Sequence, residues 1–190
     1  MYTGVIEIFS RYWRAYGGLR AVVCSPYFHL AILVLLPVTF HTWSQPNWWN
    51  DALSALPNLL GFSLAGFAIF IGFGDERFRQ ILAEPEDNPL QPTIYVALCS
   101  TFVHFIVVQI IALIYALVAK SFWFHAESMT PLEKFLPAMN LTGGAVGYAL
   151  FLYALTTVLA ATMHVFRIAS MYETFQRRNL SRAAPHNSRQ

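Results

Sequence analysis

Four long apolar segments constrain this chain more than any other feature. They cover residues 21–40, 52–74, 93–119 and 143–168, and the third contains neither a charged residue nor a proline. A helix that crosses the hydrocarbon core of a bilayer needs about 20 mostly apolar residues. Four such segments in 190 residues rarely occur in a water-soluble core, so we expect an integral membrane protein.

The composition also indicates that lipid is the solvent. Charged residues make up 12% of the chain and hydrophobic residues 56%, whereas a soluble domain carries about 25% charged residues. The net charge of +2 is too small to indicate a nucleic-acid partner. The expected fold is therefore all-α, with four transmembrane helices and an N-terminal amphipathic helix at the membrane interface.

The positions of Lys and Arg predict the orientation. If the chain crosses the membrane four times, ten of its twelve Lys and Arg residues lie on one side of the membrane. The other two, Lys120 and Lys134, lie on the opposite side. Because Lys and Arg accumulate in cytoplasmic loops, both termini are expected on the cytoplasmic side of the inner (plasma) membrane. Tryptophans are then expected at the outer interface; they are Trp43, Trp48, Trp49 and Trp123.

Three regions follow from this topology. Residues 1–20 repeat aromatic and aliphatic residues at intervals of three and four, which predicts an amphipathic helix on the inner leaflet. Residues 21–168 form the transmembrane domain, and residues 169–190 a basic cytoplasmic tail. Between the second and third crossings, the 75–92 loop should hold a short helix and a proline-rich turn. Another short helix is expected to begin near Thr130 in the outer loop.

Small and polar residues recur along the second apolar segment at intervals of three and four. They are Ser54, Asn58, Gly61, Ala65, Ala68, Gly72 and Asp75. This spacing places them on one stripe of a helix. In lipid, small side chains let another backbone approach closely, and this packing drives association between helices.

Two interpretations of the stripe remain open. It packs against another helix of the same subunit, or copies of it line a pore in a symmetric homo-oligomer. In a pore, Asn58 and Ser54 would face the outer mouth and Asp75 or Glu76 the cytoplasmic mouth, where a ring of carboxylates selects for cations. A similar stripe in the fourth segment, from Gly143 through Ala154 to His164, predicts packing between helices.

Polar side chains within the apolar segments are candidates for function, because burying them in lipid is costly. They are His29, His104, Gln109 and His164. His29 and His164 are predicted at similar depths, so a haem b held between two histidines is one hypothesis. The alternative is a neutral histidine hydrogen-bonded to a neighbouring helix.

No enzyme class is indicated. The chain lacks the G-x-S-x-G, H-E-x-x-H, P-loop and G-x-G-x-x-G motifs, and no apolar segment holds a pair of carboxylates. Cys24 and Cys99 lie in different segments without a C-x-x-C motif, so neither a redox pair nor a metal site is expected.

The favoured hypothesis is an oligomeric channel that conducts ions or small solutes, with membrane lipid and copies of itself as partners. In its overall plan the chain resembles small bacterial polytopic membrane proteins, some of which permeabilise membranes as effectors in phage defence. The main alternative is a non-catalytic anchor that docks a cytoplasmic protein through the 75–92 loop, where Glu76, Arg77 and Arg79 offer charge. A haem-binding redox protein is the third hypothesis.

Overall fold

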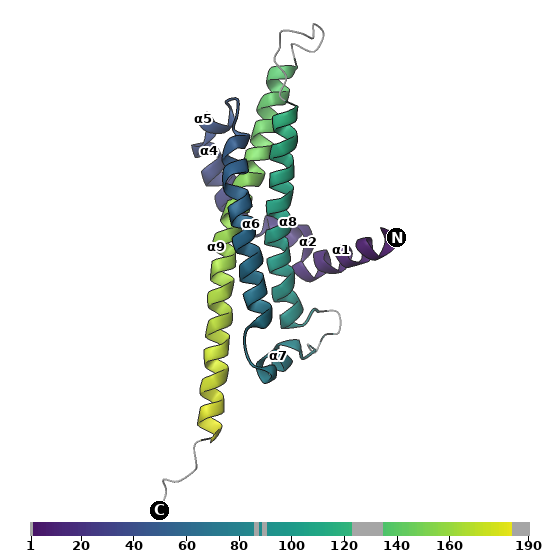
Figure 1. Ribbon diagram of the computed structural model, residues 1–190, viewed down its shortest axis with the longest axis vertical. Helices are drawn as coiled ribbons and strands as arrows, with labels where there is room; N and C mark the ends of the chain where they lie inside the picture. The colour runs from purple at the N-terminus through teal and green to yellow at the C-terminus, as the bar shows by residue number, and fades with distance from the viewer. Residues whose placement is uncertain (1, 86–87, 89–90, 123–134, 184–190) are drawn as a thin grey trace, which may run out of the picture.

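Three long helices form the body of the protein. The computed structural model describes residues 2–85, 88, 91–122 and 135–183, and within these residues it is all-helical. The long helices are α6 (Trp49–Gly72), α8 (Ile94–Ser121) and α9 (Leu136–Ala183), and they lie side by side (Figure 1). All three are long and apolar enough to cross a membrane, which indicates a membrane protein.

The ends of these helices follow from local chemistry. The Thr93 hydroxyl accepts a hydrogen bond from the Val96 amide at 3.3 Å, which caps the start of α8. The 48 residues of α9 extend about 72 Å at 1.5 Å per residue, more than twice the thickness of a hydrocarbon core of about 30 Å. The first part of the expected 169–190 tail therefore continues α9 as far as Ala183.

The first apolar segment is not one long helix. Residues 18–43 are divided into α2 (Gly18–Val23), α3 (Pro26–His29), the π-helix η1 (Leu30–Leu35), α4 (Leu36–Val38) and α5 (Phe40–Trp43). The apolar helical part, Pro26–Val38, is shorter than a normal span. Proline disfavours helical geometry in the residue before it, so Pro26 starts a new helix rather than continuing α2. Of the four spanning helices expected, three have full length among the described residues.

Two buried clusters form the core. The larger lies where α6, α8 and α9 meet η1, around Leu56, Ala112 and Leu152; the smaller lies further along the bundle, around Phe70, Phe102 and Ala161. Alanines that are almost fully buried, including Ala52, Ala112, Ala116 and Ala154, allow the long helices to approach closely.

Trp48 and Trp49, which were expected at the outer interface, pack inside the subunit. Both are buried, with exposed fractions of 3% and 4%. The Trp48 ring packs against α9 where Gly144 and Gly147 leave room for it, and a Cβ at Gly147 would overlap this ring. Trp43, half-buried, donates from Nε1 to the Leu36 carbonyl at 2.8 Å. Trp123 lies outside the described residues.

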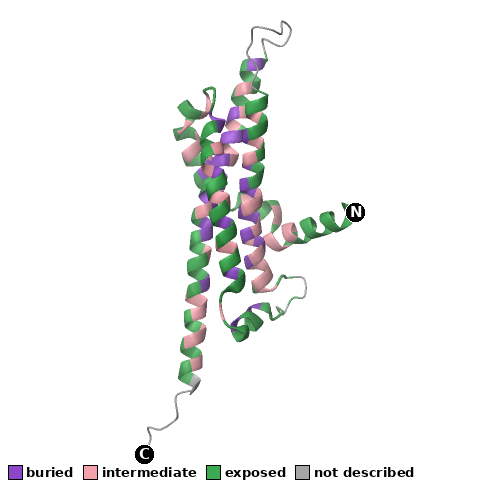
Figure 2. Cartoon of the chain, viewed as in Figure 1, coloured by how far each residue is buried: buried purple, intermediate pink, exposed green. Residues whose placement is uncertain are grey.

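Two short helices flank the bundle. The N-terminal helix α1 (Tyr2–Tyr16) projects sideways from α8, and its first ten residues are exposed (Figures 1 and 2). Gly17, with φ of 101°, separates it from α2. The expected helix in the 75–92 loop is present as α7 (Glu76–Ala83). The helix expected near Thr130 and the tail beyond Ala183 lie outside the described residues.

Candidate functional site

The small-residue stripe of α6 faces away from the rest of the subunit. Six of its seven members lie on α6, and all six are exposed: Ser54, Asn58, Gly61, Ala65, Ala68 and Gly72. A Cβ built on Gly61 or Gly72 would meet nothing within 4 Å. Packing against another helix of the same subunit, the first interpretation of the stripe, therefore disagrees with the structure.

A different face of α6 makes the contacts with α8 and α9. Its buried members are Trp49, Ala52, Leu56, Ser63 and Phe70. These recur at intervals of three, four and seven residues, so they too form one face. Of the three long helices, α6 is the least covered: 17% of its apolar window is buried, against 39% for α8 and for α9. The stripe is the part of α6 that its own chain leaves open.

Asp75, the seventh member, lies beyond the end of α6. Gly74 has φ of 83°, a conformation that glycine adopts easily, and the chain turns there into α7. Asp75 Oδ1 accepts from the Phe78 amide at 2.8 Å, and Gln176 Nε2 donates to Oδ2 at 3.4 Å. The carboxylate therefore caps α7 instead of extending the stripe. Glu76, Arg77 and Arg79 are exposed on α7.

His104 is the centre of the buried polar network. Its exposed fraction is 3%, and both ring nitrogens have partners. The Tyr12 hydroxyl lies 2.8 Å from Nδ1, and the Tyr153 hydroxyl lies 3.0 Å from Nε2. The Tyr16 ring stacks on the imidazole with 3.8 Å between centroids and 14° between planes. The network thus joins α1, α8 and α9.

A neutral imidazole satisfies this network in either of its two tautomers. Burial raises the pKa of Tyr12 to about 12, so this hydroxyl keeps its proton. With the N–H at Nε2, Tyr12 donates to Nδ1 and Nε2 donates to Tyr153; with the N–H at Nδ1, the two directions are reversed. Burial also raises the pKa of Tyr16, and the hydrogen bond with the Tyr153 side chain opposes this rise. The arrangement is that of a neutral histidine with both ring nitrogens hydrogen-bonded.

Gln109 makes a second polar contact inside the bundle. It is fully buried, and its Nε2 donates to Ser63 Oγ on α6 at 3.0 Å. Its Oε1 has no hydrogen-bond partner among the described residues. Gln109 and His104 serve different contacts, because α6 packs on one side of α8 while α1 and Tyr153 lie on another.

The other two histidines are not brought together. His29 is exposed at the end of α3, beside Phe28, whereas the ring centroid of His164 on α9 lies 5.9 Å from that of Phe105. Within the described residues, no group of three His, Cys, Asp or Glu side chains has the geometry of a metal site. The pairing of His29 with His164 that the haem hypothesis requires has no support in this geometry.

Sequence reasoning did not predict that three tyrosines surround His104. Tyr16 belongs to the apolar pattern that predicts the helix over residues 1–20, and neither Tyr12 nor Tyr153 was singled out. The spacing of Tyr12 and Tyr16, four residues apart, indicates that they share a helix face. Nothing in the spacing indicates which distant residue this face contacts.

No protein-family model, curated protein or solved structure matches this chain. The exposed α6 face and the His104 network are therefore the basis for assigning a function.

Proposed function

We propose that this protein is a subunit of a homo-oligomeric membrane channel that conducts ions or small solutes, with α6 nearest the symmetry axis. The observation that carries the proposal is the open face of α6, from Ser54 to Gly72, where every stripe member is small or polar and exposed. Lipid tails gain little from such a face, whereas a neighbouring helix can pack closely on it. One subunit has too few long helices to enclose a pathway alone.

Asn58 strengthens this reasoning. It lies about 14 Å along α6 from Trp49 at 1.5 Å per residue, which is within the apolar part of the helix, and it is exposed. An amide exposed to hydrocarbon leaves its hydrogen-bonding groups unsatisfied, at a cost of several kcal/mol. A ring of Asn58 side chains, facing one another or water in a pore, removes that cost.

The proposed topology has four crossings and an interfacial α1. The broken segment supplies the remaining crossing: α3, η1, α4 and α5 contact α9, and the Thr156 hydroxyl of α9 donates to the Tyr27 carbonyl at 3.1 Å. Arg11 and Arg14 line the same surface hollow as Gln91 and Thr93, just before α8. The basic side of α1 would then lie in water at the inner interface, as positive-inside orientation requires.

The first experiment measures assembly and conductance of the full chain. We expect a closed ring by cryo-EM in nanodiscs, the same subunit number by native mass spectrometry, and unitary currents in planar bilayers. Substituting Ala65→Leu should abolish assembly and current but preserve the helical content of the subunit, because Ala65 is exposed on the subunit surface. Ala138→Leu, the same change at an exposed alanine of α9, should leave both intact.

Two outcomes would overturn the proposal. A monomer in nanodiscs and in mild detergent would exclude the oligomer. A ring whose α6 stripe contacts lipid, or bilayers that stay silent under voltage, tension and pH change, would exclude the channel.

The anchor hypothesis has one observation in its favour. The end of α9, from about Ala169 to Ala183, extends past α6 with α7 packed against it, and it carries exposed charges such as Glu173 and Arg177. Such a surface suits a cytoplasmic protein partner. Recovery of a stoichiometric partner in pull-downs, lost on deletion of α7, together with silent bilayers, would favour this function over the channel.

A further inference from the structure

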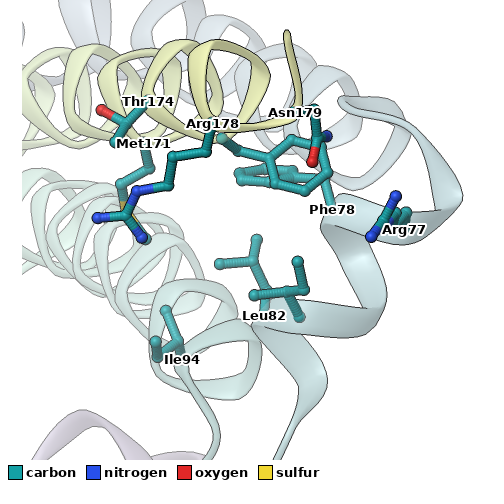
Figure 3. Close-up of a pocket in the computed structure, with 10 residues that line it drawn as sticks. Arg77, Phe78, Leu82, Ile94, Met171, Thr174, Arg178 and Asn179 are labelled. Carbon is teal, nitrogen blue, oxygen red and sulfur yellow. The ribbon is translucent and has the colours of Figure 1, made fainter. Parts of the chain in front are cut away.

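A pocket of about 440 Å³ opens between α7, the start of α8 and the end of α9 (Figure 3). Its floor is apolar and is formed by Phe78, Ile81, Leu82, Ile94, Met171 and Phe175. Arg77 and Arg178 line it on opposite sides of these residues (Figure 3). Its volume is in the range of small-molecule sites, about 300–1,000 Å³.

Aromatic packing between α7 and α9 keeps the two helices together beside the pocket. The Phe78 ring packs on Tyr172 and Phe175, with centroid distances of 5.1 Å and 5.6 Å. A Cβ at Gly74 would lie 2.7 Å from Phe78 Cδ1, so the turn into α7 needs glycine for space as well as for its positive φ. Phe78 and Leu82 are buried, which fixes α7 as one wall of the pocket.

The described lining of the pocket carries positive charge. Among the described residues that line it, two are Arg and none is Asp or Glu. Within the described part of the chain, the recorded ion pair is Arg177–Glu173 at 2.8 Å, and neither Arg77 nor Arg178 takes part in one. Glu76, next to Arg77 in sequence, does not line the pocket, and Asp75 is engaged in capping α7. Two guanidinium groups are thus available to an anion.

The position of the pocket limits the kind of ligand that would fit it. It lies beyond Gly72, where α6 ends, and beside Ile94, where α8 begins. Both Ile81 and Ile94 remain about two-fifths exposed, so the apolar floor is continuous with the surface of the spans. A ligand suited to this site carries a hydrocarbon chain and an anionic group, and lies in the adjacent leaflet.

We propose that this pocket binds an anionic phospholipid, with an acyl chain on the apolar floor and its anionic headgroup held at the rim by the positive charge of Arg77 and Arg178. Guanidinium groups bind phosphate through charge-assisted, often bidentate hydrogen bonds, and basic pockets beside spanning helices are typical sites for acidic lipids. The site requires α7 to lie at a membrane surface, and it does not depend on conduction by the protein.

The test is a lipid titration of the full chain by native mass spectrometry, with phosphatidylglycerol and phosphatidylcholine as probes. We expect the wild type to retain phosphatidylglycerol in preference. The double variant R77Q/R178Q should weaken binding of phosphatidylglycerol about tenfold or more and leave phosphatidylcholine unchanged. The matched control R79Q/R177Q removes the same charge from the same two helices outside the pocket.

A second variant tests the apolar floor. Thr174 lines the pocket and is exposed, so Thr174→Trp should fill the space without a change of charge or of the core. We expect it to reduce retention of phosphatidylglycerol, and inorganic phosphate should compete only weakly, because it has no acyl chain. If R77Q/R178Q fails to fold, Thr174→Trp still tests whether the pocket binds the lipid.

Three results would overturn the proposal. Equal losses in the two double variants would mean diffuse attraction to a basic surface. Normal lipid retention by Thr174→Trp would remove the pocket from the binding site. Competition by inorganic phosphate as strong as by the lipid would identify a soluble anion as the ligand instead.

Discussion

The hydroxyl group of Tyr12 lies 2.8 Å from Nδ1 of His104, across 92 residues of sequence. This contact connects the N-terminal helix to the centre of the bundle. The first turns of α1 are exposed, so Tyr12, Trp13 and Tyr16 supply its attachment to α8. The consequence is that a helix expected to lie freely on the membrane is tied to a buried histidine.

Replacing Tyr12 with Phe should loosen α1. The change removes the hydroxyl and leaves Nδ1 of His104 buried without a partner, which costs about 1–3 kcal/mol. We expect faster amide hydrogen exchange in α1 and a lower thermal midpoint in detergent. Tyr2→Phe is the control, because Tyr2 is 79% exposed on the same helix. Equal exchange in the two variants would contradict the role of Tyr12.

Two glycines should respond differently to the same substitution. A Cβ at Gly147 would overlap the Trp48 ring and lie 2.6 Å from Tyr115 Cε1, whereas a Cβ at Gly61 meets nothing. Gly147→Ala should therefore destabilise the subunit by about 1–3 kcal/mol, and Gly61→Ala should not. Thermal unfolding of the two variants in the same detergent measures the difference. Similar midpoints would contradict the packing of Trp48 on α9.

The Gln109–Ser63 pair gives a double-mutant prediction. Ser63→Ala leaves the buried Gln109 amide without its partner and should destabilise the bundle by about 1–2 kcal/mol. Adding Gln109→Leu removes the unpaired amide together with the unsatisfied Oε1, so the double variant should regain most of the lost stability. Additive losses in unfolding experiments would show that Gln109 has another partner.

We expect Asp75 to stabilise α7 and not to line the mouth of a pore. Asp75→Ala removes the cap on the Phe78 amide, at a cost of about 0.5–2 kcal/mol. We expect faster hydrogen exchange at Phe78 through Leu82 and weaker retention of phosphatidylglycerol, because α7 forms a wall of the pocket. Glu76→Ala, at an exposed position that makes no cap, is the control. Intact α7 protection in Asp75→Ala would contradict this assignment.

Some features of the fold were predictable because they depend on neighbours in sequence. Long uncharged segments predicted α6, α8 and α9, and the charged boundary after Gly74 predicted a short helix in the loop, present as α7. The structure of the first apolar segment, residues 21–40, was harder to predict. Pro26 and Pro37 were visible in the sequence, but the effect of two prolines on 20 apolar residues depends on whether neighbouring helices support the break.

The two small-residue stripes show the limit of pattern reasoning. The same rule, that small residues permit close approach, applies to the α9 stripe and to the α6 stripe. On α9, Gly147, Ala154 and Ala161 are buried in the subunit, whereas on α6, Gly61 and Ala65 are exposed. Spacing identifies a face that allows close contact, but not the helix that makes it.

Segment length and polarity were therefore sufficient to identify a helical membrane protein, because insertion into lipid depends on the local hydrophobicity of about 20 residues. Only the packed bundle decided that His104 binds Tyr12 and Tyr153, that Trp48 is buried against Gly147, and that α6 keeps its small residues exposed. Each of these depends on the rotation of one helix against another. Contacts between residues far apart in the chain set that rotation, and no local pattern contains them.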